Sequence, residues 1–85
     1  MNTYSYKTKD LTLATFLTAI NIPLLDSHKE GFKFVWTFGF KSQEEANQIV
    51  NDFYNGVYKV SAIKLFECHR RLKSQIINYE NEKVI

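Results

Sequence analysis

The sequence predicts an α+β fold in which helices cover one face of a three-stranded antiparallel sheet, in the order β-α-β-β-α-α. Aromatic rings stand at every second position from Phe32 to Phe40, which is the side-chain period of a strand with one apolar face. Ser42 and Glu45 match a capping box, the signature of a helix start. With 85 residues, of which 45% are apolar, the chain is expected to form one domain, residues 1–85, with a modest core.

The first two predicted elements are a short strand and a helix. Residues 4–8 alternate between larger and polar side chains, and the alternation stops at Asp10, which we expect to be the N-cap of the helix that follows. Apolar side chains within residues 13–20 then fall on one helical stripe. Pro23 requires this helix to end by about Ile22.

A hairpin is predicted next. Residues 22–27 match a strand, residues 28–31 supply a turn in which Gly31 can adopt a positive φ, and residues 32–40 form the returning strand. Five exposed rings on one face would promote aggregation, so we expect them to enter the core. These rings belong to Phe32, Phe34, Trp36, Phe38 and Phe40.

Two helices complete the predicted fold. The capping box begins the first of them, and Asn55 with Gly56 ends it. Ser61 begins the second, which we expect to run to about Tyr79 or Glu80 before a polar tail.

The last helix is expected to carry two apolar seams on its helical wheel. One seam contains Leu65, Cys68, Leu72, Ile76 and Tyr79, and the other contains Ile63, Phe66 and Ile77. This apolar arc is too broad for a helix on one flat surface. Either the helix is wedged between the sheet and the preceding helix, or one seam packs against a second copy of the protein. In the second case we expect a symmetric homodimer with three residues at its interface, namely Leu72, Ile76 and Tyr79.

A family resemblance spans nearly the whole chain and lies mainly in expected core and cap positions. The matching residues are Tyr6, Thr8, Asp10, Leu11, Leu13, Ala14, Phe16, Leu17, Phe34, Phe38, Tyr54, Val60, Phe66, Leu72, Lys73 and Ile76. In these positions the chain resembles a family of short uncharacterised proteins of low-GC bacteria and their phages and prophages, carried as a domain of unknown function. The family usually has glycine where this chain has Asn21. The resemblance implies a shared fold and a mobile-element setting, in which small modules bind nucleic acid or block a host protein; it supplies no catalytic or ligand residues.

The residue content argues against an enzyme. The sequence has no glycine-rich phosphate loop, nucleophile elbow or carboxylate pair at a useful spacing. Cys68 has no disulfide partner within the chain, and it lacks zinc-site spacing with His28 and His69. We therefore expect no catalytic residue, no cofactor and no metal. The sequence shows neither a signal-peptide pattern nor a run of membrane-spanning length, so we expect a cytoplasmic protein with no membrane partner. The family resemblance implies that the cell is a bacterial host.

Nucleic-acid binding is our first functional expectation, and it depends on charge distribution because the net charge is only +2. If the rings point inward, three lysines share the open face of the sheet, and three further bases lie on the last helix. The expected nucleic-acid-binding residues are Lys7, Lys9, Lys33, Lys64, Arg70 and Arg71. Without a base-reading motif they predict weak, salt-sensitive contact with DNA or RNA.

Two alternatives stay open. Lysines on a sheet are also an ordinary protection against edge pairing. The low net charge and the surplus apolar seam favour a protein-protein interaction module instead, acting as a homodimer or as an inhibitor of a host protein.

Overall fold

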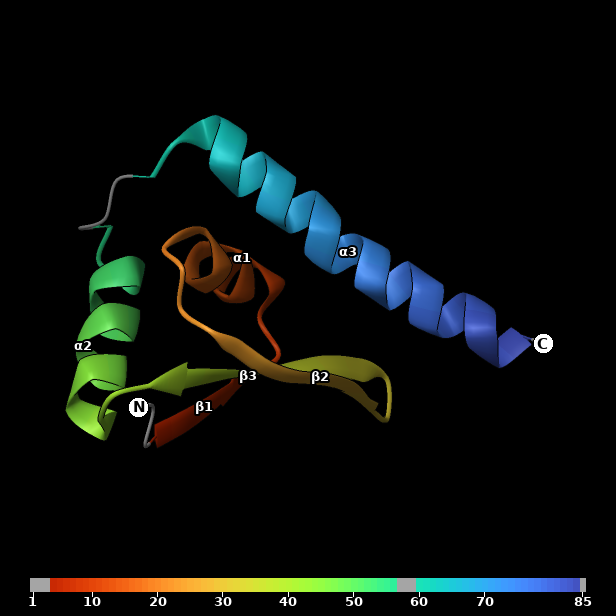
Figure 1. Ribbon diagram of the computed structural model, residues 1–85, viewed down its shortest axis with the longest axis horizontal. Helices are drawn as coiled ribbons and strands as arrows, with labels where there is room; N and C mark the ends of the chain where they lie inside the picture. The colour runs from red at the N-terminus through yellow and green to blue at the C-terminus, as the bar shows by residue number, and fades with distance from the viewer. Residues whose placement is uncertain (1–3, 57–59, 85) are drawn as a thin grey trace.

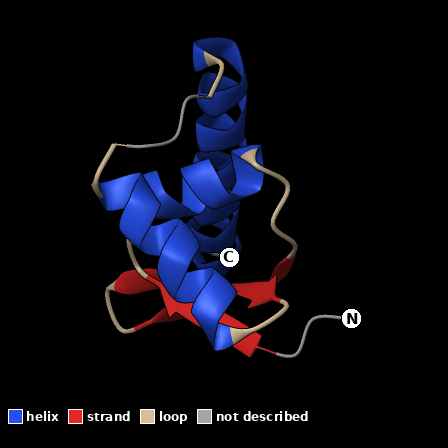
Figure 2. Cartoon of the chain, turned by 90° about the vertical axis from the view of Figure 1, so that its left-hand side faces the viewer, coloured by secondary structure: helices blue, strands red, loops and turns tan. Residues whose placement is uncertain are grey.

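The structure has the predicted order of elements and an α+β fold. The computed structural model describes residues 4–56 and 60–84, with side-chain environments through Ile77. The sheet is antiparallel, in the order β1-β3-β2, and consists of β1 (Tyr4–Thr8), β2 (Leu24–Glu30) and β3 (Lys33–Phe40). The helices are α1 (Leu11–Ala19), α2 (Gln43–Tyr54) and α3 (Ala62–Val84). All three lie on one side of the sheet, as Figures 1 and 2 show.

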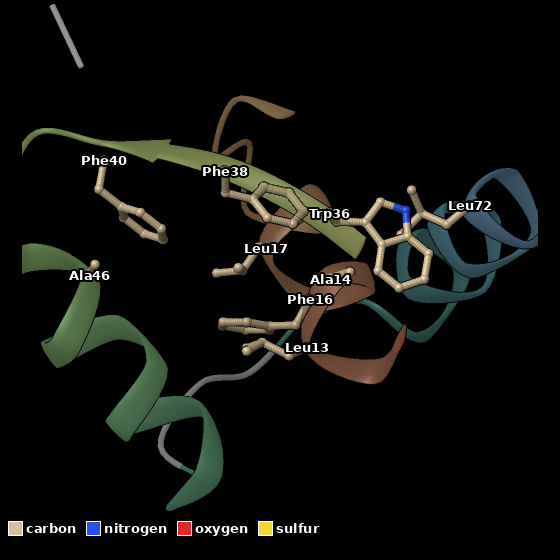
Figure 3. Close-up of a cluster of buried hydrophobic side chains, with 9 residues drawn as sticks. All are labelled: Leu13, Ala14, Phe16, Leu17, Trp36, Phe38, Phe40, Ala46 and Leu72. Carbon is tan, nitrogen blue, oxygen red and sulfur yellow. The ribbon is translucent and has the colours of Figure 1, made fainter. Parts of the chain in front are cut away.

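The central strand β3 supplies most of the sheet's contribution to the core. Trp36, Phe38 and Phe40 are almost fully buried, which confirms the prediction for these rings. Figure 3 shows Phe40 on the side of Ala46 in α2 and Phe38 above Leu17 in α1. At the other end of the cluster, Trp36 lies beside Leu72 of α3. One strand therefore anchors three helices. Each of these aromatic side chains buries roughly 150–250 Å² of surface, which would be exposed to water without the helices.

Local capping explains where α1 begins and ends. The Asp10 carboxylate accepts a hydrogen bond from the Thr12 amide at 2.9 Å, which confirms the predicted N-cap. After the helix, the amide of Ile22 donates to the Leu17 carbonyl and the amide of Asn21 donates to the Thr18 carbonyl. These two hydrogen bonds form a Schellman motif, which requires a residue with left-handed backbone conformation just after the helix. Asn21 has φ 68°, a left-handed conformation that asparagine tolerates and glycine adopts without steric cost.

The predicted limits of α2 are also confirmed. The Ser42 hydroxyl oxygen accepts a hydrogen bond from the Glu45 amide at 3.1 Å. At the other end, Gly56 has φ 71° and its amide donates to the Phe53 carbonyl, which stops the helix.

The hairpin differs from the prediction at its turn. Strand β2 continues through Glu30, which pairs with Lys33, so the turn is formed by Gly31, at φ 61°, and Phe32. The Phe32 ring is fully exposed, and its expected place in the core is therefore wrong. Phe34 is half-buried and packs against the Trp36 ring, with 5.3 Å between ring centroids.

Helix α3 is longer than predicted and packs mainly against α1. Figure 1 shows α3 crossing above α1 and projecting beyond the sheet. It is therefore not wedged between the sheet and α2. One side of this helix, including Cys68 and Leu72, is buried, and the opposite side faces away from the domain.

Candidate functional site

The open face of the sheet carries Lys7 and Lys33, and Lys9, which follows the end of β1, lines the same surface beside Lys7 and Glu30. Lys7 pairs with Thr37 in the register of β1 with β3, and both point away from the ring-bearing face. Lys7, Lys9 and Lys33 are exposed, whereas Thr37 and Val35, at the centre of the face, are buried. The face is thus a shallow surface of small central side chains with long polar side chains around them.

Acidic side chains share this face, which sequence reasoning missed. Asp26, His28 and Glu30 alternate along β2 and pair with the open-face positions of β3. The His28 ring lies between the two carboxylates, with Nδ1 2.7 Å from Asp26 Oδ2 and Nε2 2.7 Å from Glu30 Oε2. The hydrogen bond to Glu30, followed by that to Asp26, raises the pKa of His28. We name this cluster the β2 clasp.

The β2 clasp changes the electrostatics of the open face. The hydrogen bond from His28 lowers the pKa of Glu30, and the nearby Lys9 and Lys7 lower it further. Glu30 therefore stays ionised beside the very lysines that were expected to contact phosphates. The open face is a mixed surface of cations and anions, and phosphate binding there meets repulsion as well as attraction.

The three expected nucleic-acid contacts on α3 lie on the other side of the molecule. Lys64, Arg70 and Arg71 are exposed, but α3 lies above α1 on the ring-bearing side of the sheet, opposite the open face that carries the lysines (Figures 1 and 2). The six residues are therefore not brought into one surface.

Two of the three residues expected at a dimer interface, Leu72 and Ile76, pack in or against the core of the monomer. Leu72 is 1% exposed and belongs to the core beside Trp36, and Ile76 packs against that core. The expectation is corrected for Leu72, which stabilises the core of the monomer. Tyr79 lies outside the residues whose side chains are described. The exposed seam is the other one, since Ile63, Phe66 and Ile77 are 72%, 68% and 50% exposed.

Beside this exposed seam lies an apolar cleft between the helices. The cleft has a volume of about 560 Å³. Its walls come from the start of α1, the end of α2 and the first turns of α3, through Thr12, Thr15, Phe16, Phe53, Gly56, Val60, Ala62, Leu65, Phe66 and His69. We name it the interhelical cleft. Its volume lies within the range of about 300–1,000 Å³ that is usual for ligand pockets.

A shallower groove continues from the interhelical cleft along α3. It has a volume of about 260 Å³ and shares Phe66 and His69 with the cleft. The groove is completed by Arg70, Lys73, Ser74 and Ile77. The Arg70 guanidinium lies over the Phe66 ring, with 5.6 Å from Cζ to the ring centroid. We name this surface the α3 groove.

The described residues do not bring His, Cys, Asp and Glu side chains together at either surface. Among the residues that the structure describes, no three His, Cys, Asp or Glu side chains form a group that could hold a metal ion. Cys68 is buried, whereas its neighbour His69 is exposed at the cleft, so the two side chains point in different directions. Within the described part of the chain, no helix is long and apolar enough to cross a membrane.

Comparison with known proteins gives one match. Residues 3–79 match the model of a protein family described as a domain of unknown function. No curated protein and no solved structure matches the chain.

Proposed function

This chain belongs to the DUF5659 family of domains of unknown function, and from that premise we propose that it is a non-catalytic accessory module that binds another protein through the α3 groove. The partner is a host-cell protein, and the module acts in the cytoplasm of a bacterial host as part of a phage or prophage. The mobile-element setting and the host partner rest on the family resemblance set out from the sequence.

One observation carries the protein-binding proposal. Ile63, Phe66 and Ile77 are large apolar side chains that are at least half exposed on the outward side of a single helix. Burying apolar surface contributes about 25 cal/mol per Å². A monomer rarely leaves such side chains together on one surface unless the surface binds something. The neighbouring interhelical cleft adds a concave site where a partner side chain can be enclosed.

Photo-crosslinking inside cells tests this proposal. A photoreactive phenylalanine analogue replaces Phe66 in one version of the chain, and Asn47, which is exposed on α2, in the control. We expect one discrete protein adduct from position 66 that position 47 does not form, and excess unmodified domain should compete it away. If position 66 gives only the adducts of position 47, the α3 groove is not the binding surface. An adduct with a second copy of the chain would instead identify homodimerisation.

Nucleic-acid binding is a second candidate, favoured by one observation. Lys7, Lys9 and Lys33 are exposed on the same open sheet face. It ranks second because Asp26 and Glu30 share that face, and because the cations of α3 lie on the opposite side. Single-stranded and duplex DNA and RNA should be titrated at several salt concentrations. Replacing any one of the three lysines by alanine should lower the salt slope by about one unit if this candidate is right. Absence of binding at low salt would remove it.

A further inference from the structure

We propose that the α3 groove binds an acidic amphipathic helix of the partner protein, with one large apolar side chain of that helix inserted into the interhelical cleft. This inference rests on the proposed protein-binding function and specifies the chemistry of the partner. Three features carry it: the shape of the groove, the lining of the cleft and the sign of the charges around both.

The groove has the shape of a helix-packing site. Its α3 residues recur at helical spacing from Phe66 through Arg70 and Lys73 to Ile77, so they form one continuous row along the helix. From Ala62 in the cleft to Ile77 the row covers about 22 Å at 1.5 Å per residue, or roughly four helical turns. Rows of side chains on one helix accept the ridges of another helix, which is the geometry of helix-in-groove recognition.

The interhelical cleft provides the anchor position. Phe16, Phe53 and Leu65 supply apolar walls from three different helices, so a side chain that enters the cleft meets apolar atoms on several sides. The Thr15 hydroxyl donates a 2.7 Å hydrogen bond to the Leu11 carbonyl. Because this polar group already has a partner, Thr15 is compatible with the wall of an apolar cleft. A tryptophan, phenylalanine or leucine of the partner satisfies such a site, because a buried anchor supplies most of the energy at interfaces of this kind.

The charges select an acidic partner. Between Ala62 and Ile77, α3 carries four bases, Lys64, Arg70, Arg71 and Lys73, against the single acid Glu67. Two of these bases, Arg70 and Lys73, line the α3 groove itself, together with His69. Carboxylates on the flanks of a partner helix would face these cations, which raises the association rate and excludes basic partners.

Other occupants fit less well. A second copy would bring the cations of one α3 against those of another, with Arg70 of each copy near the middle of the contact. Nucleic acid would match the cations, but its phosphates would leave Phe66 and Ile77 without apolar partners. An acidic helix satisfies the apolar and the charged side chains together.

Selection from a peptide library tests the inference with the full chain. The probe is a displayed library of peptides of about 16 residues, long enough for four helical turns, in which apolar, acidic and basic residues vary at every position. We expect enriched sequences with apolar residues at helical spacing, at least one of them aromatic or leucine, and an excess of Asp and Glu. Basic or extended enriched sequences, or no enrichment at all, would overturn the inference.

Three matched variants then locate the bound peptide. Arg70→Glu should weaken binding of an enriched peptide by about tenfold, whereas Arg71→Glu, the same change on the flank outside the groove, should leave it within about twofold. Thr12→Trp places a large side chain in the interhelical cleft and should also abolish binding. Asn47→Trp is its control on the exposed side of α2. Equal effects of Arg70→Glu and Arg71→Glu, or unchanged binding by Thr12→Trp, would contradict the proposed site.

The results of the library selection and of the photo-crosslinking distinguish failure of this inference from failure of the proposed function. A protein adduct at position 66 together with basic or extended library sequences would retain protein binding and reject the acidic helix. If position 66 gave no specific protein adduct and the library gave no acidic helical peptides, the proposed function would be rejected as well.

Discussion

The Tyr54 hydroxyl donates a 3.0 Å hydrogen bond to Asp10 Oδ2, joining the last residue of α2 to the N-cap of α1. The other oxygen of the same carboxylate accepts from the backbone amides of Thr12 and Leu13. Phe53, which precedes Tyr54, and Thr12, two residues after Asp10, line the interhelical cleft. The Tyr54–Asp10 bond therefore holds together two walls of the candidate site.

Tyr54→Phe tests this bond. The change removes only the hydroxyl, and we expect the free energy of unfolding to fall by about 0.5–1.5 kcal/mol, the usual net worth of one hydrogen bond. The loss should lie at the lower end of this range because Tyr54 is 60% exposed, so water can replace part of the hydrogen bond. Urea denaturation of the variant and the wild type provides the measurement. An unchanged midpoint would show that the bond does not stabilise the packing of α2 on α1.

The stabilisation by the Tyr54–Asp10 hydrogen bond should depend on pH in the alkaline range. Burial, followed by the hydrogen bond to Asp10, raises the pKa of Tyr54 above its ordinary value of 10.0. The folded state therefore keeps this proton more tightly than the unfolded chain does, so the contribution is present below pH 10 and is lost as the pH rises through the folded pKa. The stability difference between wild type and Tyr54→Phe should narrow above pH 10 in urea denaturation at stepped pH. A difference that widens instead would contradict the sign of the shift.

The two seams of α3 should respond differently to truncation. Leu72→Ala removes a core side chain and should cost about 2–5 kcal/mol, whereas Phe66→Ala on the exposed seam should stay within about 0.5 kcal/mol. Both variants are measured by urea denaturation. Equal losses for the two variants would mean that the exposed seam is covered in the folded protein.

The left-handed residue after α1, Asn21, gives a further prediction. Asn21→Gly should be neutral or stabilising, because glycine adopts φ 68° without steric cost. Asn21→Val should lower the free energy of unfolding by about 1–3 kcal/mol, because a β-branched side chain is strained there. Thermal melts of both variants provide the measurement, and a valine variant as stable as the wild type would rule out the Schellman geometry.

The β2 clasp can be observed by NMR titration of the His28 ring. Its pKa should lie above 6.5 in the wild type, and Glu30→Gln should lower it more than Asp26→Asn does, because the hydrogen bond to Glu30 is the largest cause of the shift. Since the folded-state pKa is raised, the stabilisation by the clasp is present below pH 6.5 and is lost as the pH rises through the folded pKa. An unchanged His28 titration in both variants would show that the clasp does not form.

Strong local signals account for the parts of the fold that the sequence predicted. Asp10, Ser42 and Gly56 stand at helix ends whose unsatisfied backbone groups favour those residue types, and the structure confirms all three. The alternation in β3 was equally informative, because the rings on one face of that strand pack against the helices, whereas the smaller Val35 and Thr37 lie on the other face. Phe32 matched the alternation only by position, since it lies in the turn.

The missed features depend on contacts between elements. The end of β2, from His28 to Glu30, was assigned to a turn because these residues are polar, and an edge strand with an open face shows no apolar period at those positions. Helix α3 has two apolar seams, and its crossing over α1 decides which one is buried. The interhelical cleft combines residues from three helices, so no single segment of sequence indicates it.

Photo-crosslinking from three positions in the same cells tests the central claim most directly. The photoreactive residue stands at Phe66 in the α3 groove, at Lys33 on the open face of the sheet, or at Asn47 on α2. We predict a discrete protein adduct from position 66 and none at that mass from positions 33 and 47. A nucleic-acid adduct from position 33, with no specific protein adduct from position 66, would contradict the account.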